Sequence, residues 1–504
     1  MKKIVSGNEL REKIGVAITM LCGTVKSTLG PKGSNVIIDH SNFSPFITND
    51  GVTIALNIES DDPVINTILE LTKEASVKTN ETVGDGTTTT LVLLEAIYNY
   101  GMKLMDEGVS PIILKKELDS TLLKILNMID KHCKDATKGD LQLIACNSAN
   151  SMFIGKIVSD AFLKVKNRSS ILLKEGNFDC TKINYIKGYT FDSVLASPYF
   201  LNKNEINFNS PFVLIINEII DDIEMISENL NNIIKNNNSL VVIAKDYSAE
   251  VTEQVLSLYL DENVDVVLLK NPEFGIREYY FEKDIKAILD NQTDGYKSVK
   301  NIKINKDRVT ISFNSNKSLT NYIKKLKKIE NNSEFDKSYI EEKISMFQNG
   351  IAEIVVGANT ITERRELKMR YEDAICAVSS CKEGILPGSG IIYSLICEDL
   401  NDDSVGDEIF KNALTKPLEQ ILINASTDSY ILNEIKNSHY NKIYNVKTNK
   451  FENIKNTKIL DPNLVVKNAL KNACSIASML LTTDSLVINE YKNELQKVND
   501  FNEM

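Results

Sequence analysis

The segment Gly84-Asp85-Gly86-Thr87-Thr88-Thr89-Thr90 combines two glycines, a carboxylate and four threonines, a pattern that points to phosphate binding. Its glycines allow a close approach of the backbone to a ligand. Residues 87–105 have helical spacing, so the threonines are expected at a helix N-terminus, serving phosphate oxygens rather than packing. Asp85 adds an oxygen ligand of the kind that Mg²⁺ shares with phosphates. Taken alone, the segment favours a simpler alternative, a Gly-Asp-Gly turn capped by threonine.

The composition is that of a globular protein with more than one domain. A chain of 504 residues exceeds what one core usually holds. The formal net charge of -11 argues against a nucleic-acid partner, which needs a basic face. The eight cysteines include no Cys-x-x-Cys pair, and the three histidines lack metal-ligand spacing. We therefore expect free thiols in a reducing compartment.

The N-terminus resembles a secretory signal but is better explained as a helix. An apolar stretch ends near Cys22, yet charged residues at positions 9, 11, 12 and 13 interrupt its approach. The spacing of Leu10, Ile14, Ile18 and Leu21 indicates an amphipathic helix of the mature protein. No segment reaches the length of a bilayer span, so we expect a cytoplasmic protein with no membrane partner.

The pattern of apolar residues predicts a multidomain protein of α and α/β parts. The first 130 residues are mainly helical, with a turn at Asp50-Gly51, and the α/β character begins near residue 187. Two helices are expected over 317–349 around Asn331-Asn332-Ser333, and helices follow to the end. Strands are expected at 35–39, 46–48, 212–216, 240–244, 264–269 and 351–356. Helical outer segments thus flank an inserted α/β middle.

Familiar nucleotide motifs are absent from the sequence. Gly155-Lys156 is followed by Ile157, so there is no P-loop, and Gly388-Ser389-Gly390 lacks the third glycine of a dinucleotide fingerprint. A nucleotide site would therefore be built from dispersed loops. The candidate loops are residues 28–33, 48–52, 84–90, 372–374 and 386–390.

Together these segments resemble the group I (GroEL-type) chaperonins. The motifs follow that family's order from about residue 5 to residue 487. They are Thr28-Leu29-Gly30-Pro31-Lys32-Gly33, Asp50-Gly51-Val52, Gly84 to Thr89, Ser148-Ala149-Asn150, Ser197-Pro198-Tyr199-Phe200, Glu372-Asp373-Ala374 and Ile459-Leu460-Asp461-Pro462. The combination of the first motif with the Gly-Asp-Gly-Thr-Thr-Thr segment is highly specific.

The resemblance implies three domains and a ring-shaped homo-oligomer. A mainly helical equatorial domain, which binds ATP, would comprise 1–131 and 384–504. A small α/β intermediate domain would comprise 132–187 and 351–383, and an inserted α/β apical domain would be 188–350. Gly188, Gly350 and Gly384 match hinge glycines. Seven-membered rings stacked in pairs, unfolded polypeptide clients and a GroES-type co-chaperonin are the implied partners.

The resemblance also assigns an ATP site and a client surface. Asp373 would position the attacking water, Asp50 would assist, and Asp85 would hold Mg²⁺, with K⁺ as a second candidate cation. Because Asp373 and Asp85 would lie in different domains, hinge closure would complete the site. The nucleotide would contact Thr28, Leu29, Gly30, Pro31, Asn49, Gly51, Gly86, Thr87, Thr88, Thr89, Ser148, Gly388, Ser389, Asn445, Val446 and Asp461. Clients and co-chaperonin would contact Leu195, Tyr199, Phe200, Leu230 and Leu256.

Several positions depart from the family's pattern. Near the nucleotide, Asn49 replaces a lysine, Ser389 a glycine and Val446 an alanine. Glu419 stands where an arginine is used between rings, and the glycine-methionine tail is replaced at 497–504. The apical region is polar where the family is apolar at Ser227, Thr252 and Ser257, and it is short near 290–300.

These residues are compatible with three functions to different degrees. The first is an ATP-driven folding chaperone that encloses non-native polypeptides in a ring, which the three retained aspartates favour. The alternative is a divergent chaperonin paralogue with ATP-binding rings but restricted client binding or a structural role, which the polar apical positions favour. A metabolic enzyme is poorly supported, because no nucleophile–base pair is present.

Overall fold

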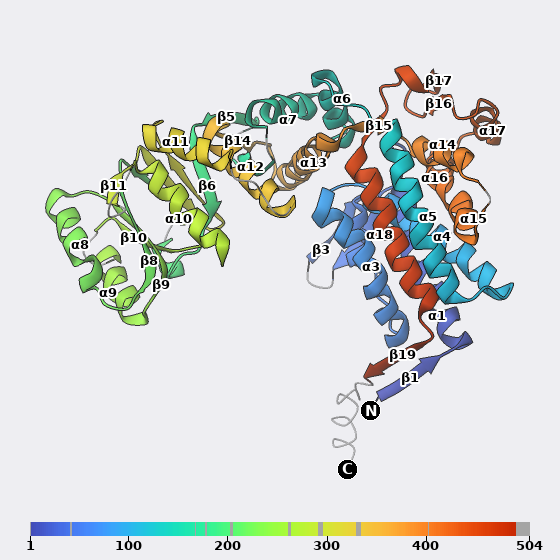
Figure 1. The fold of residues 1–504 in the computed structure, drawn as a ribbon, viewed down its shortest axis with the longest axis horizontal. Helices are drawn as coiled ribbons and strands as arrows, with labels where there is room; N and C mark the ends of the chain where they lie inside the picture. Colours follow the sequence, from blue (N-terminus) through green and yellow to red (C-terminus); the bar gives the residue numbers. More distant parts are fainter. Residues whose placement is uncertain are drawn as a thin grey trace, which may run out of the picture. The chain divides into compact units, whose positions relative to one another are not determined.

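The structure is a computed structural model, which describes residues 2–40, 43–166, 168–176, 179–201, 205–260, 264–290, 296–328, 334–401 and 403–489. The chain divides into two compact units, shown in Figure 1. The first unit comprises residues 1–159 and 370–504, and the second comprises residues 160–369. An inserted middle segment between two outer segments is what the sequence predicted. The division into three domains stays a prediction, as does the cytoplasmic location.

The first unit is mainly helical. Its helices are α1 (Asn8–Val25), α2 (Gly51–Leu56), α3 (Pro63–Val83), α4 (Thr87–Asp106), α5 (Pro111–His132), α6 (Lys138–Ser148), α14 (Ile391–Asp399), α15 (Val405–Leu414), α16 (Lys416–Asn424), α17 (Ser429–Asn437) and α18 (Asn463–Thr482). Short 3₁₀ turns are η1 (Lys26–Thr28), η4 (Ser380–Glu383) and η5 (Ile454–Asn456). Helices α7 (Met152–Val165) and α13 (Ile361–Ser379) begin in one unit and end in the other.

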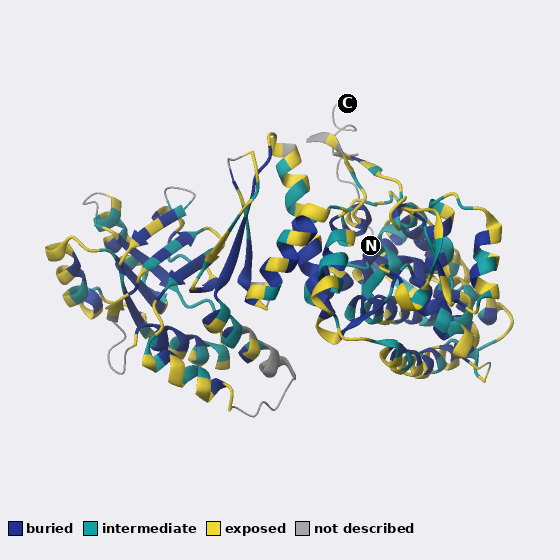
Figure 2. Cartoon of the chain, turned by 90° about the horizontal axis from the view of Figure 1, so that it is seen from above, coloured by how far each residue is buried: buried dark blue, intermediate teal, exposed yellow. Residues whose placement is uncertain are grey.

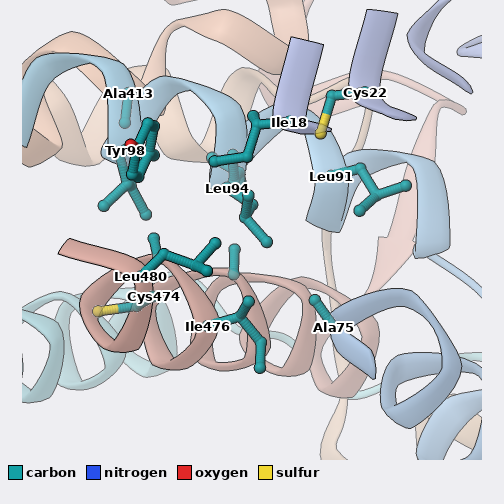
Figure 3. Packing of buried hydrophobic residues seen from close by; sticks show 14 of the residues in the cluster. Ile18, Cys22, Ala75, Leu91, Leu94, Tyr98, Ala413, Cys474, Ile476 and Leu480 are labelled. Carbon is teal, nitrogen blue, oxygen red and sulfur yellow. The ribbon is translucent and has the colours of Figure 1, made fainter. Parts of the chain in front are cut away.

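Helix α18 is the centre of the first unit, packed against α3, α4 and α5 (Figure 1). Apolar residues of α1, α3, α4, α15 and α18 meet in one buried cluster (Figure 3). Ile14, Ile18 and Leu21 of α1 belong to this cluster, which confirms the amphipathic helix predicted there. The cluster includes residues from both ends of the chain. Packing within it holds α4 in place, including its N-terminus, where the Gly84–Thr90 segment begins the helix.

Four small antiparallel sheets complete the first unit. They pair β1 (Lys2–Ser6) with β19 (Ser485–Asn489), β2 (Val36–His40) with β3 (Phe43–Thr48), β15 (Ile385–Pro387) with β18 (Leu460–Pro462), and β16 (Lys442–Asn445) with β17 (Lys450–Asn453). The two strands predicted before residue 50 are confirmed. At Asp50-Gly51, where a turn was predicted, the chain enters a helix, and the Asp50 side chain caps the N-terminus of α2.

The second unit contains three sheets with helices. Strands β4 (Ile171–Glu175), β14 (Ile351–Val356) and β5 (Lys182–Ile186) form one sheet in that order. A second has the order β6 (Gly188–Asp192), β13 (Arg308–Ser312), β12 (Asn301–Asn305) and β7 (Glu205–Asn209). The third has the order β10 (Val266–Lys270), β9 (Leu240–Tyr247), β8 (Phe212–Ile220) and β11 (Tyr296–Ser298). The remaining elements are α8 (Glu224–Asn236), α9 (Ala249–Leu260), α10 (Ile276–Ile288), α11 (Lys317–Leu326), α12 (Glu334–Asn349), η2 (Arg168–Ser170) and η3 (Pro198–Phe200).

The third sheet confirms the apolar runs predicted as buried strands. Strands β8, β9 and β10 are parallel neighbours, and β9 is buried over its first five residues. Figure 2 shows these strands in dark blue, with exposed residues on the helices and loops of the unit. Continuous apolar runs are typical of parallel strands covered on both faces. The predicted turn at 331–333 and the tail at 497–504 lie outside the described residues.

A membrane helix is not found in the described part of the chain, where no helix combines the required length and apolar character.

Candidate functional site

The Gly84–Thr90 segment forms a sharp connection between two long helices. Helix α3 ends at Gly84 and α4 begins after Gly86, and both glycines have left-handed backbones with φ of 68° and 80°. Neither glycine can gain a side chain easily, because a Cβ on Gly84 would lie 2.4 Å from Cys376 Sγ and one on Gly86 would lie 2.7 Å from Val465 Cγ1. The turn thus presents the free N–H groups at the start of α4.

The four threonines of this segment do not all face a ligand. Thr90 is fully buried, and its hydroxyl donates to the Gly86 carbonyl and lies 3.1 Å from the Thr79 hydroxyl. The prediction that none of the four serves packing is therefore wrong for Thr90. Thr88 Oγ1 lies 3.5 Å from Thr28 Oγ1, so two of the predicted segments meet here. Thr89 lines the cavity beside the turn.

A cavity of about 510 Å³ in the first unit collects most of the predicted nucleotide contacts. It lies between the loop after η1, the turn at α4, the end of α6 and the β15–β18 and β16–β17 segments. The predicted residues that line it are Leu29, Gly30, Pro31, Asn49, Asp85, Thr89, Ser148, Ser389, Asn445, Val446 and Asp461. Segments more than 400 residues apart thus share one cavity.

Three predicted carboxylates lie within electrostatic reach of one another. Burial raises the pKa of Asp373 to about 7, and the charges of Asp85 and Asp50 contribute to that rise. Burial likewise raises the pKa of Asp85, which the Gly86 N–H lowers and the Asp50 charge raises. Neighbouring negative charges disfavour the ionised form of each carboxyl, which agrees with these raised pKa values.

Asp461 is a fourth acidic residue of the site, and like Asp85 it lines the cavity. Burial and the Asp85 charge raise its pKa to about 7, while a hydrogen bond from the Ser389 N–H opposes that rise. Asp461 also leaves little room for a side chain at Gly388, the residue before Ser389. A Cβ on Gly388 would lie 2.7 Å from Asp461 Oδ1.

Other predicted residues of the site lie outside the lining of the cavity. Asp50 accepts hydrogen bonds from Thr53 N at 2.9 Å and Thr53 Oγ1 at 2.5 Å, so its oxygens are partly used in capping α2. Gly51 approaches Thr88, since a Cβ there would lie 2.5 Å from Thr88 Oγ1. The predicted site residues that do not line the cavity are Asp50, Asp373, Thr28, Gly51, Gly86, Thr87, Thr88 and Gly388.

Sequence reasoning missed several residues of the site. Asn424, at the end of α16, donates to the carbonyls of Lys26 and Leu29 at 2.8 and 2.9 Å and so holds the loop that lines the cavity. Tyr444, Lys447 and Lys458 also line the cavity. Tyr444 and Lys447 flank the predicted Asn445-Val446 pair, so proximity in sequence was the only signal. Nothing in the sequence pointed to Asn424.

The residues fit a magnesium-bound phosphate better than a metal held by protein alone. The described residues contain no group of three His, Cys, Asp or Glu side chains arranged to bind a metal ion. Mg²⁺ commonly takes one or two carboxylates and completes its shell with water and phosphate oxygens. Asp85, beside the free N–H groups of α4, provides this combination.

The predicted client residues differ widely in exposure. Phe200 and Leu230 are buried in the core of the second unit, because the core needs these apolar side chains, so the predicted surface does not include them. Leu195 and Leu256 are half-buried, and Tyr199 is 70% exposed. Tyr199 is therefore the one fully accessible member of this set of five.

The predicted hinge glycines occupy element boundaries. Gly188 begins β6, Gly350 follows α12, and Gly384 ends η4. Gly350 has φ of 75°, and a Cβ there would lie 2.5 Å from the Ile186 carbonyl oxygen, so only glycine fits. Their role as hinges stays a prediction.

Comparison with known proteins gives consistent matches over nearly the whole chain. The model of the TCP-1/cpn60 chaperonin family matches residues 21–490. Two crystal structures of the chaperonin gp146 from the bacteriophage EL 2 (Pseudomonas aeruginosa), in the presence of ATP-BeFx, have the same fold. One has a TM-score of 0.71 at 21% identity and the other 0.73 at 22% identity. Each comparison covers 97% of this chain and 99% of the phage chain.

Proposed function

The chain belongs to the TCP-1/cpn60 chaperonin family, and from this premise we propose that it is an ATP-dependent chaperone that assists the folding of non-native polypeptides inside a ring-shaped homo-oligomer. The observation that carries the ATP-dependent part is the position of Asp85. Its carboxylate lines the cavity at the N-terminus of α4 and lies within electrostatic reach of Asp50 and Asp373.

Each part of the proposed site has a distinct task. The N–H groups at the start of α4 and the hydroxyl of Thr89, which lines the cavity, bind phosphate oxygens, and Asp85 would hold Mg²⁺. When bound, Mg²⁺ would supply charge neutralisation at the phosphates. Asp373 orients the attacking water, and the raised pKa of its carboxyl suits a group that accepts a proton near neutral pH. Asn445, Val446 and Asp461 contact the base and ribose.

The coupling of hydrolysis to folding rests on the three-domain hypothesis. In that arrangement Asp373 belongs to the intermediate domain and Asp85 to the equatorial domain, so domain closure completes the site. The phage chaperonin gp146, which has the same fold, was crystallised in two crystal forms in the presence of ATP-BeFx, which supports a nucleotide ligand here. Two stacked seven-membered rings, a GroES-type co-chaperonin and a K⁺ site are further parts of the proposal.

Refolding of a denatured client tests the proposed function directly. The purified chain is mixed with a denatured enzyme, with and without Mg-ATP and a GroES-type co-chaperonin, and the recovered client activity is followed. We expect ATP-dependent recovery and seven-fold rings in negative-stain images. Recovery that is the same without ATP would contradict the ATP-dependent mechanism, and a stable monomer would contradict the ring.

A further inference from the structure

Two segments that line the cavity come from a small hairpin and the chain that follows it. Tyr444, Asn445, Val446 and Lys447 form one wall at the end of β16, and residues 458–462 form another. Along the chain, β17 lies between the two walls and pairs with β16, which carries Tyr444 and Asn445. An isolated hairpin of this size is marginally stable in water. Additional contacts are therefore needed to hold the two walls in place.

Ile443 and Val446 supply apolar contacts in a buried cluster, and Glu452 of β17 supplies polar contacts that connect the two walls. Its Oε1 accepts a hydrogen bond from Asn445 Nδ2 at 2.7 Å, and its Oε2 accepts one from Thr457 Oγ1 at 3.1 Å. Thr457 Oγ1 in turn accepts from the Ile459 N–H at 3.1 Å. Glu452 is half-buried and Thr457 is buried, so these bonds are partly shielded from water. One carboxylate thus connects the two walls.

The same contacts fix the orientation of the Asn445 amide. Asn445 Oδ1 accepts from the N–H groups of Lys447 at 3.0 Å and Thr448 at 3.3 Å. With its nitrogen donating to Glu452, the amide has no alternative flip that keeps all three hydrogen bonds. The wall that would contact the base is therefore ordered before a ligand enters.

We propose that Glu452 is a positioning residue for nucleotide recognition, which holds Asn445 and the Thr457–Ile459 segment at the base end of the cavity. This inference rests on the proposed ATP-binding function. Glu452 itself is not among the residues that line the cavity. Its loss should weaken binding of the nucleotide while leaving the carboxylates around Asp85 in place.

ATP titration by calorimetry and steady-state ATP hydrolysis, both with the full chain, test the proposal. For Glu452→Ala we expect the Kd for ATP to rise about tenfold, because two hydrogen bonds to a charged group are lost. The value of kcat at saturating ATP should stay within about twofold, since the phosphate end is unchanged. Glu452→Gln should recover part of the affinity, as one acceptor oxygen remains.

Glu434→Ala is the matched control. Its carboxylate pairs with Lys442 of the same hairpin at 3.2 Å but contacts neither Asn445 nor Thr457. This variant should bind ATP like the unaltered chain. Thr457→Val removes one of the two bonds to Glu452 and keeps the side-chain shape, so it should show a smaller rise in Kd than Glu452→Ala.

The outcomes distinguish a failure of the proposed ATP-binding function from a failure of the positioning role of Glu452. An unaltered chain that does not bind ATP overturns the proposed function and this inference together. Normal binding by the unaltered chain with the same Kd in Glu452→Ala overturns the inference alone. An equal loss of kcat and affinity also overturns it, because that pattern indicates general disruption. If Glu452→Ala does not fold, Thr457→Val and Glu452→Gln decide, and an unchanged Kd in both overturns the positioning role.

Discussion

Asp373 lies on α13 within electrostatic reach of Asp85 and Asp50, and this proximity gives the residue its proposed role. A carboxylate that orients water acts in hydrolysis and contributes little to ligand binding. For Asp373→Ala we expect the rate of ATP hydrolysis to fall by about 10²-fold or more, in the range of general acid–base contributions. The Kd for ATP should change by less than about threefold, because phosphate binding does not depend on this group.

Single-turnover hydrolysis and equilibrium ATP binding measure the two effects separately. Glu74→Ala, an exposed acidic residue on α3, is the control for the loss of one negative charge. Unchanged turnover in Asp373→Ala would remove this residue from the reaction.

Gly86 shows how a backbone position limits the side chain. Its φ of 80° disfavours any other residue, and an added Cβ would meet Val465 Cγ1 at 2.7 Å. We expect Gly86→Ala to lower the free energy of unfolding of the first unit by about 1–3 kcal/mol. Urea titration measures this loss.

Gly108→Ala provides the comparison for this variant. Gly108 also has a left-handed backbone, with φ of 101°, but no heavy atom lies within 4 Å of an added Cβ. Gly108→Ala should lower the free energy of unfolding only by the part that comes from backbone strain. Equal losses in the two variants would show that contact with Val465 adds nothing.

At the scale of the element, local patterns predicted what depends on neighbours in sequence. Helix α4 and strands β8, β9 and β10 were found from apolar periodicity, because each buries a continuous face or run. The Thr90 hydroxyl lies beside that of Thr79 on the preceding helix, and Asn424 donates to the Leu29 carbonyl, 395 residues away in the sequence. Such contacts leave no local signature, so the motifs located the cavity but not its supporting network.

Strand β14 carries a buried charge whose effect depends on pH. Burial alone would raise the pKa of Glu353, but hydrogen bonds from Asn184 at 3.1 Å and Lys174 at 3.0 Å outweigh burial and lower that pKa. A carboxyl whose pKa is lower in the folded state stabilises the fold above the unfolded pKa of about 4.3. This stabilisation is lost as the pH falls through the folded pKa.

We expect Glu353→Gln to lower the free energy of unfolding by about 1–3 kcal/mol at pH 7. The difference from the unaltered chain should begin to shrink below about pH 4.3, where the unfolded carboxyl takes up a proton, and should be lost below the lower folded pKa, where the folded carboxyl is also neutral. Urea titrations of the second-unit transition in a series from pH 7 downward through the folded pKa measure it. Glu205→Gln is the control, because Glu205 also contacts Lys174 at 2.9 Å but is more exposed, so its loss should be smaller. A difference independent of pH would contradict the assigned charge effect.

At the scale of the whole molecule, the two units have separate cores. One buried cluster contains residues of the first unit alone, and another contains residues between Tyr189 and Phe347 of the second unit. Glu419, which replaces an arginine used between rings in the family, pairs within its own chain with Lys416 at 2.8 Å and Lys436 at 3.6 Å.

Separate cores predict that the second unit folds by itself. Residues 160–369, expressed alone, enclose the sheets β10-β9-β8-β11 and β6-β13-β12-β7 together with the apolar cluster between them and their helices. A domain with its own core keeps its cooperative transition when it is separated. We expect a single thermal transition by circular dichroism and no binding of ATP, since every residue that lines the cavity belongs to the first unit.

A shortened fragment without residues 334–369 is the control, because it lacks Phe347 and strand β14. A gradual transition in the 160–369 fragment would show that its core needs the first unit, and the inserted segment would then not be a domain in the folding sense.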